Sequence, residues 1–253
     1  MKIATWNVNG IRARQGQVLE FVEREKPDVL CLQEIKASID QLTFELRDIE
    51  GYWGHWHGGK GYSGVALLFA KSLAPSAPGI VHPPFDFEQR ICTATAATPI
   101  GEVTFASVYV PNGGKDFPAK MRFLEAIETW AAESKAAGRP LVLCGDLNVA
   151  RSDMDIHPKE RKPNQVGARP DERAQFEQIL SHDLVDVGRA MDPTNENLFT
   201  WWAPWRNLRQ RNIGWRIDYV LASSPIAART RSIVVHREFG TSDHGPVVVE
   251  FNI

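Results

Sequence analysis

Cysteine is scarce in this sequence: only three occur in 253 residues, and their spacing fits neither a disulfide framework nor a zinc site. Cys31 and Cys144 lie inside apolar runs, and Cys92 lies between Ile91 and Thr93. Free cysteine is among the residue types most often buried. We therefore predict three buried, reduced thiols, and the odd count argues against an oxidising compartment.

Long apolar runs are also missing. No stretch approaches the roughly 18 apolar residues that a membrane-spanning helix requires. The first residues, MKIATW, lack the basic start, apolar stretch and small-residue cleavage site of a secretory signal. We expect a cytoplasmic protein that does not enter a membrane.

An excess of basic residues is absent as well, since the sequence has 29 Lys and Arg but 31 Asp and Glu, and its net charge is −2. Overall charge therefore does not favour a nucleic-acid partner. Local clustering differs, because residues 206–216 hold four arginines and no acid, with Trp202, Trp205 and Trp215 in or beside them. This stretch is either a solvated charged loop or a nucleic-acid surface, and the interleaved aromatic residues favour the surface.

What the sequence does have is a series of short apolar runs that predict strands. They cover residues 3–8, 29–32, 65–69, 91–96, 103–110, 141–144, 215–221, 232–235 and 247–251. Helical spacing follows Arg12 as far as Pro27, and again between Pro118 and Gly138. A third helix is predicted with Asp171 as its N-cap. Strands alternate with helices early and follow one another later, so we predict one α/β domain over 1–253 with mixed sheets.

Polar residues follow the predicted strands, where active sites gather in α/β proteins. They are Asn7, Asn9, Gln33, Glu34, Asp146, Asn148, Asp218, Asp243 and His244. Carboxylates and amides suit Mg²⁺, which prefers oxygen ligands. Each residue alone also has an ordinary explanation, such as a turn cap, a surface acid or a hydrogen bond at the start of a strand. The set therefore suggests a metal site without establishing one.

Six segments, in order and spread over nearly the full length, resemble the exonuclease III family of AP endonucleases. They read TWNVNGIR (5–12), CLQEIK (31–36), YVPN (109–112), GDLN (145–148), GWRIDY (214–219) and SDHGP (242–246). That family belongs to a superfamily with deoxyribonuclease I, inositol polyphosphate phosphatases and sphingomyelinases. The resemblance implies a four-layer sandwich, in which two mixed β-sheets pack face to face and helices cover both outer faces.

The resemblance also implies catalytic roles. Glu34 corresponds to the main Mg²⁺ ligand, with Mn²⁺ as a substitute ion, and Asn7 and Asp243 lie nearby. Asp146 and Asn148 correspond to the residues that orient and activate the attacking water. Such a site positions a nucleophile and neutralises the charge that develops on the phosphate.

Further roles concern the phosphate. His244, held by Asp218, corresponds to a group that contacts the scissile phosphate, and Tyr109 and Asn112 correspond to further phosphate contacts. An Asp–His hydrogen bond selects one tautomer and favours the charged imidazolium.

The DNA-binding residues follow in the same way. Trp201, Trp215 and Ile217 correspond to the lining of a pocket for a flipped-out abasic sugar, although the tryptophans are also explained as ordinary core residues. Lys115 and Trp205 correspond to residues near DNA. From the charged stretch we add Arg209 and Arg211 as DNA contacts.

The activity so implied is Mg²⁺-dependent hydrolysis 5′ to abasic sites in duplex DNA, together with 3′→5′ exonuclease and 3′-end cleaning, by a monomer. The sequence departs from the family pattern at two places. Asn9 replaces an Asp of some eukaryotic relatives, and residues 149–158 differ in length and charge from the same segment of the commonest relatives. Two alternatives stay open. One is a phosphoesterase of the superfamily acting on a small or lipid substrate, and the other is a regulator of the same fold without catalysis.

Overall fold

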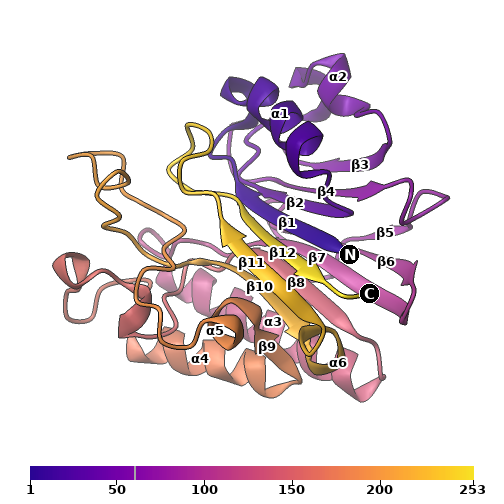
Figure 1. The fold of residues 1–253 in the computed structure, drawn as a ribbon. Coiled ribbons are helices and arrows are strands. Elements are labelled where there is room, and N and C mark those ends of the chain that lie inside the picture. Colours follow the sequence, from indigo (N-terminus) through magenta and orange to yellow (C-terminus); the bar gives the residue numbers. More distant parts are fainter. Residues whose placement is uncertain (60) are drawn as a thin grey trace.

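The structure, a computed structural model, describes residues 1–59 and 61–253. Two six-stranded sheets form its centre (Figure 1). The first contains, in spatial order, β11 (Thr230–Val235), β12 (Val247–Phe251), β1 (Lys2–Asn7), β2 (Val29–Gln33), β4 (Val65–Ala70) and β3 (Tyr52–His57). The second contains β5 (Ile80–Val81), β6 (Ile91–Thr98), β7 (Gly101–Tyr109), β8 (Leu141–Asp146), β10 (Asp218–Ser223) and β9 (Leu184–Asp186). Both sheets are mixed, because β1 pairs in parallel with β2, and β7 with β8, whereas their other neighbours pair antiparallel.

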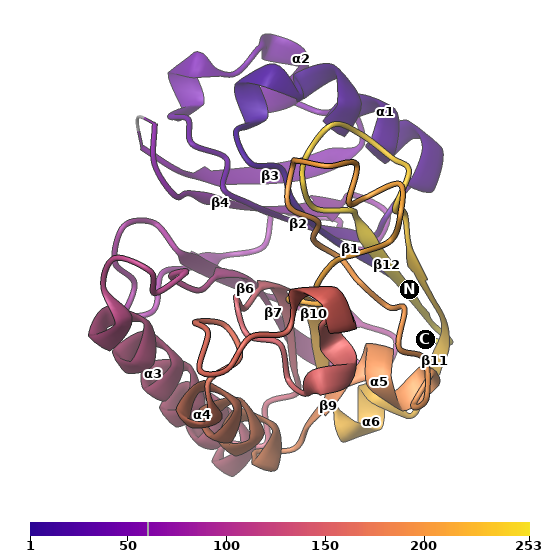
Figure 2. The same ribbon diagram turned by 90° about the vertical axis from the view of Figure 1, so that its left-hand side faces the viewer.

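Helices cover the two outer faces, as Figure 2 shows in side view. They are α1 (Gln15–Glu25), α2 (Phe44–Arg47), α3 (Phe117–Ala136) and α4 (Pro170–Ser181). The short helices α5 (Val187–Met191) and α6 (Ser224–Ala227) instead contribute Val187 and Ile226 to the core between the sheets. The first sheet packs on α1 and α2, and the second on α3 and α4. The predicted four-layer sandwich is confirmed.

Each interface between layers has its own apolar core. Between the sheets, Phe69 meets Phe105 edge-on, with ring centroids 5.6 Å apart. Under α1, Trp6 packs against Phe21, and under α3 and α4 the buried side chains include Phe176. Burying one such side chain contributes roughly 1.5–3 kcal/mol. The strict burial of both faces explains why the central strands appear in the sequence as continuous apolar runs.

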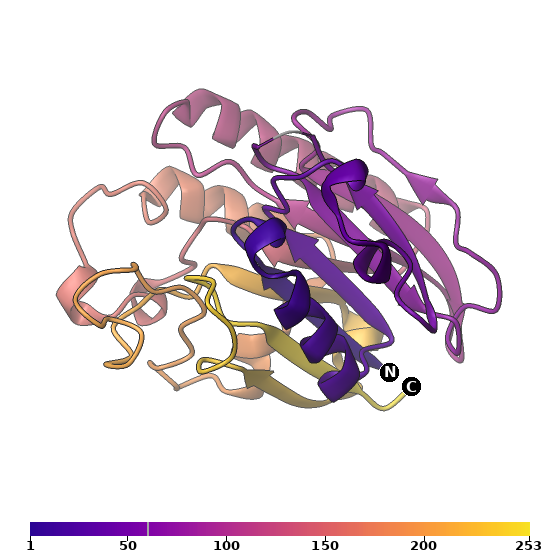
Figure 3. The ribbon, with the colours of Figure 1, turned by 90° about the horizontal axis from the view of Figure 1, so that it is seen from above.

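Strand register brings the predicted polar residues to one end of the sandwich. Asn7 pairs with Gln33 at the ends of β1 and β2, and Asp146 pairs with both Tyr109 and Asp218 in the other sheet. Because parallel strands end at the same edge, their following loops share that edge. In Figure 3 the loops before β10 and β12, in orange and yellow, lie at this end, away from both termini.

Two boundaries differ from expectation. The strand predicted over 215–221 begins at Asp218, because Trp215 pairs only in isolated bridges with Ile156 and Trp201. Asp171 is not the N-cap of α4, since the helix begins at Pro170 after Arg169.

The reason for the shifted cap is that proline suits the first helical position. The Arg169 N–H also donates to Glu172 at 3.0 Å, which completes the first turn.

Several short elements escaped the sequence analysis, namely β3, β5, β9, α2, α5 and α6. Their residues do not form the apolar runs that marked the central strands. The three cysteines are free and buried, as predicted. Among the residues described, no helix is long and apolar enough to cross a membrane.

Candidate active site

Glu34 directly follows β2 and has a φ of 49°, in the left-handed region. Asn7, at the end of β1, donates through Nδ2 to Glu34 Oε1 at 2.8 Å and to Asp146 Oδ2 at 2.9 Å. Its Oδ1 accepts the Asn9 N–H at 2.9 Å, which sets the orientation of the amide. Asn7 therefore ties together carboxylates from the two sheets, and its own oxygen is engaged by the backbone.

Asp146 ends β8 and is 1% exposed. Asn148 donates through its N–H to Asp146 Oδ1 at 2.9 Å and through Nδ2 to the Val110 carbonyl at 2.9 Å. A φ of 51° at Asn148, a conformation that Asn tolerates better than most residues, turns the chain back over Asp146. The sequence GDLN thus forms a tight loop that presents one carboxylate and one amide to the same space.

His244 lies between two aspartates. Its Nδ1 is 2.9 Å from Asp218 Oδ2, and its Nε2 is 4.0 Å from Asp146 Oδ2. Thr200 Oγ1 donates to Asp218 Oδ2 at 2.6 Å and so holds that carboxylate in place. With Nδ1 donating to Asp218, the Nε2 edge of the ring faces Asp146.

Burial and neighbouring charges shift the pKa values of both His244 and Asp146. Burial alone lowers the pKa of an imidazole, but Asp218, Asp146 and Asp243 outweigh it and raise the pKa of His244 to about 10. Burial raises the pKa of Asp146 to about 8, against the opposing effect of His244. His244 is therefore cationic at neutral pH, and additional positive charge nearby favours the ionised form of Asp146.

Glu34 and Asp146 bring carboxylate oxygens close enough to share a metal ion, and His244 lies beside them. One ligand atom from each of Glu34, Asp146 and His244 lies within 4.8 Å of the others. Asp243 does not join them, because it accepts from Asn9 at 2.8 Å and from Trp201 at 2.9 Å. The two carboxylates are suitable donors for a divalent cation. The cationic ring of His244 has no free lone pair and faces the same space as a hydrogen-bond donor.

Lys36, which the sequence analysis did not select, contacts the other side of Glu34. Its Nζ lies 2.6 Å from Glu34 Oε2 and donates to Asn9 Oδ1 at 2.6 Å. Glu34 Oε1 accepts from Asn7, so both of its oxygens have partners. The carboxylate is held in a defined orientation, and a cation bound to Oε2 competes with the lysine.

Most of the site residues predicted from the sequence line one pocket of about 350 Å³. These are Glu34, Tyr109, Asn112, Asp146, Asn148, Trp201, Trp215, Ile217, Asp243 and His244. Trp201 and Trp215 meet at 83° with ring centroids 6.2 Å apart, so their planes form two adjoining walls. The pocket is therefore polar on the side of Glu34 and His244 and aromatic on the other.

Part of the lining comes from the loop before α4, whose contribution the sequence left open. It supplies Gln165, Val166 and Gly167. Gly167 has a φ of 90°, and a Cβ there would lie 3.2 Å from the Trp215 ring. Only glycine fits this position without strain.

A buried ion pair holds this loop, and it was also missed. Lys120 on α3 pairs with Glu172 on α4, and both side chains are fully buried. Lys120 Nζ also donates to the Asn148 carbonyl at 2.7 Å, while Glu172 accepts the Gly167 N–H at 2.8 Å. Burial lowers the pKa of Lys120 despite Glu172. The pair links the catalytic loop to the pocket wall.

The predicted DNA contacts divide into outward and inward groups. Lys115 and Arg211 are exposed, and Trp205 is 58% exposed. Arg209 turns inward: its guanidinium donates to the carbonyls of Arg237, Phe239 and Ser242 and stacks on Trp202 at 5.2 Å.

Arg216 is also directed inward. It forms two bonds to Asp186, at 2.8 and 2.7 Å, and one to Asp155 at 2.7 Å. Two of the four arginines in the charged stretch therefore hold the protein together instead of facing solvent.

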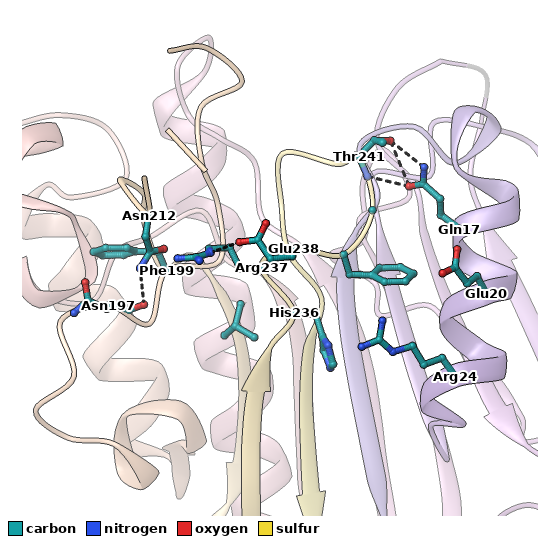
Figure 4. Close-up of a pocket in the computed structure, with 13 residues that line it drawn as sticks. Gln17, Glu20, Arg24, Asn197, Phe199, Asn212, His236, Arg237, Glu238 and Thr241 are labelled. Carbon is teal, nitrogen blue, oxygen red and sulfur yellow. Dashed lines mark hydrogen bonds and ion pairs between the residues drawn. The ribbon is translucent and has the colours of Figure 1, made fainter. Parts of the chain in front are cut away.

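A larger hollow of about 810 Å³ lies apart from these residues, between α1 and the segments around 197 and 236–241 (Figure 4). Gln17 closes one side by accepting the Thr241 N–H at 3.0 Å. Its lining contains neither Glu34 nor Asp146 nor His244. The predicted site residues therefore gather in the smaller of these two hollows.

The fold and the site agree with a match to a known protein family. The sequence profile of the Endonuclease/Exonuclease/phosphatase family matches residues 4–244. The chain belongs to this family.

Relatives narrow the similarity. An exodeoxyribonuclease from Bacillus subtilis is 33% identical, covering 100% of both chains. Exodeoxyribonuclease III from Haemophilus influenzae is 30% identical, covering 99% of this chain and 100% of the relative. The resemblance to the exonuclease III family is confirmed.

Solved structures agree. A 3′ phosphatase from Neisseria bound to a product DNA hairpin superposes with a TM-score of 0.90 at 30% identity, covering 100% of both chains. An AP endonuclease from Archaeoglobus fulgidus gives 0.86 at 30% identity, also over 100% of both.

Proposed function

We propose that this protein is a Mg²⁺-dependent DNA repair nuclease that cuts 5′ to abasic sites in duplex DNA and trims damaged 3′ ends. One observation carries the proposal: Glu34, Asp146 and His244 converge at one end of a pocket whose other walls are Trp201 and Trp215. A phosphodiester-cleaving centre thus adjoins an aromatic cavity. Duplex DNA is the expected partner and a monomer the expected state.

Glu34 is the proposed main ligand for Mg²⁺, which supplies Lewis acidity and neutralises charge on the phosphate. Asn7 acts through its hydrogen bonds to Glu34 and Asp146, and Asp243 borders the same space. Mn²⁺, also an oxygen-preferring ion, serves as a substitute.

The remaining catalytic residues act on water and phosphate. Asp146 accepts the proton of the attacking water, and Asn148 orients that water. His244, cationic and held by Asp218, donates from Nε2 to a phosphate oxygen. Tyr109 and Asn112 line the same pocket and donate to further phosphate oxygens. Such positioned donors stabilise the charge of the transition state.

The aromatic part of the pocket sets the substrate. Trp201, Trp215 and Ile217 form a cavity that suits a deoxyribose without a base. Extruding a nucleotide costs least where no base is stacked or paired, so an abasic site enters more readily than an intact one.

Contacts to the duplex come from the rim. Lys115, Trp205 and Arg211 are exposed and are proposed to touch DNA. For Arg209 the inward geometry supports a different role, which is to hold the 237–242 loop next to Asp243 and His244.

Two alternatives are less well supported. A phosphoesterase for small or lipid substrates has no use for the exposed side chains of Trp205 and Arg211. A regulator without catalysis has no use for two buried carboxylates around a cationic imidazole, an arrangement that is costly to bury.

A side-by-side assay tests the proposal with three duplexes: one with an abasic analogue, one with a recessed 3′-OH and one with a 3′-phosphate. We expect Mg²⁺-dependent cleavage of all three, abolished by EDTA and strongly reduced in Asp146→Asn. Turnover of an inositol phosphate or sphingomyelin without any DNA cleavage would reverse the assignment.

A further inference from the structure

Three histidines lie together at the rim between the two sheets, and none of them lines the active-site pocket. His55 and His57 are on β3, the edge strand of the first sheet. His82 directly follows β5, the edge strand of the second sheet. The cluster therefore connects the open edges of the two sheets.

The strand pattern explains why these rings converge. Residues two apart share one face of a strand. Trp53 packs against the core between the sheets, so His55 and His57 point toward the same side at its margin. The His57 and His82 ring centroids are 3.9 Å apart, and those of His55 and His82 are 5.2 Å apart.

The available nitrogen atoms are close enough to share one ion. One ring nitrogen of each histidine lies within 4.8 Å of the other two. Tetrahedral Zn²⁺ with bonds of about 2.0–2.1 Å requires nitrogens roughly 3.3 Å apart. His82 is exposed, so its ring can make this small movement.

One nitrogen in the cluster is left unsatisfied. His55 Nε2 is buried and has no hydrogen-bond partner within 1–59 and 61–253. A buried polar atom without a partner costs about 1–3 kcal/mol. A metal ion supplies the missing partner.

His57 has the outer contact typical of a metal-bound histidine. Its Nε2 lies 2.6 Å from Asp86 Oδ2, which leaves Nδ1 for an ion. Asp86 is itself anchored, because Oδ1 accepts the N–H groups of Arg90 at 2.8 Å and Ile91 at 3.1 Å. A carboxylate in this position fixes the tautomer and strengthens the ligand.

We propose that His55, His57 and His82 bind one divalent transition-metal ion, Zn²⁺ foremost, as a clasp between β3 and the segment after β5. Imidazole ligands suit Zn²⁺, Ni²⁺ or Cu²⁺, whereas Mg²⁺ prefers oxygen. The clasp is chemically distinct from the active-site cluster, and it does not depend on the nuclease function.

The test uses the whole protein with excess Mg²⁺ and with Glu34→Gln to weaken metal binding at the active site. Zn²⁺ is titrated by calorimetry, and Co²⁺ by its visible absorption. We expect one equivalent of Zn²⁺ and a tetrahedral Co²⁺ spectrum. At free Zn²⁺ about 100-fold above Kd, the thermal midpoint should rise by roughly 5–10 °C.

Variants locate the ion. His82→Gln, at an exposed side chain, should abolish the binding of one equivalent of Zn²⁺ and the rise in the thermal midpoint. Asp86→Asn should weaken the affinity for Zn²⁺ about 10–100-fold. His182→Gln is the matched control, because that histidine pairs with Glu128 elsewhere. Equal Zn²⁺ binding in the His82 and His182 variants, or an octahedral Co²⁺ spectrum, would overturn the proposal.

Nuclease activity separates the two proposals. His82→Gln in an otherwise unchanged chain should cleave abasic duplex with Mg²⁺ at the normal rate. Loss of the Zn²⁺ equivalent together with normal cleavage supports the clasp. A chain that binds Zn²⁺ at the histidines but never cleaves DNA refutes only the nuclease.

Discussion

The Nδ1 atom of His244 lies 2.9 Å from Oδ2 of Asp218, and both side chains are buried. The hydrogen bond selects the tautomer and keeps the ring cationic beside Asp146. In the proposed mechanism Asp218 acts on the phosphate only through His244, so it is a positioning residue.

Replacing Asp218 with Asn should lower kcat about 10²–10⁴-fold, the range seen when the orienting carboxylate of a catalytic histidine is lost. The pKa of His244, which Asp218 raises, should fall, so the alkaline limb of the pH–rate profile should move to lower pH. Asp48→Asn at the surface is the control. A profile that keeps its alkaline limb while kcat falls would contradict the role.

Substitutions at the three converging residues should differ in kind. Glu34→Ala should mainly raise the Mg²⁺ concentration needed for half-maximal rate, since it removes a ligand. Asp146→Asn and His244→Asn should lower kcat by on the order of 10³ or more at saturating Mg²⁺. Metal titrations of each variant provide the measurement, and equal small losses in all three would rule out these assignments.

Substitutions of Arg209 and Arg211 should affect the salt dependence of DNA binding differently. Arg211→Ala should reduce the slope of log K against log salt by about 0.9, as for one lost phosphate contact. Arg209→Met should leave the slope unchanged but lower the thermal midpoint and kcat, because it releases the 237–242 loop. A reduced slope for Arg209→Met would restore it to the DNA interface.

Breaking the Lys120–Glu172 ion pair should lower the free energy of unfolding. Lys120→Met leaves a buried carboxylate unpaired, so we expect a loss of about 3–5 kcal/mol in urea unfolding. Adding Glu172→Gln removes that charge and keeps an acceptor for the Gly167 N–H, so part of the stability should return. The surface pair Arg237–Glu238 is the control, with about 0–1 kcal/mol for Arg237→Ala. No recovery in the double variant would show that charge burial is not the cause.

Asp155 gives a pH dependence of stability. Burial raises its pKa, but Arg216 and Arg189 outweigh this, and the net shift is downward. A carboxyl group with a lowered folded-state pKa stabilises the protein above its unfolded pKa of about 3.9, and that contribution is lost as pH falls through the folded value.

Asp155→Asn should therefore cost about 3–5 kcal/mol at pH 7, with the gap to the parent narrowing below about pH 4. Neighbouring Asp153, whose side chain is 72% exposed, is the matched control. A gap independent of pH would mean that packing, and not the ion pairs, accounts for the loss.

Much of the architecture could be predicted from local patterns. Continuous apolar runs marked the central strands because both faces of each sheet are buried, and helical spacing marked α1 and α3. The short edge strand β3 escaped because its Trp and His residues form no apolar run. The candidate catalytic residues could be proposed because six motifs hold them in the order of a known family.

The residues that were missed act through long-range contacts. Lys120 and Glu172 look like ordinary helical charges, and His55 and His82 look like isolated surface residues, until the helices and sheet edges are placed together. Arg209 and Arg216 read as part of a basic stretch, yet their guanidinium groups satisfy buried carbonyls and carboxylates. Composition cannot tell an arginine that faces solvent from one that a distant acceptor draws inward.

The sequence by itself determined the family, the central strands and the longer helices, and it predicted Glu34, Asp146 and His244 as site residues. Local propensity and short motifs are sufficient for these. The tertiary structure decided which charges are paired, which arginines face outward, how the loop before α4 closes the pocket, and that three histidines meet. These depend on burial and on distances between residues far apart in the chain, and neither exists before the chain is folded.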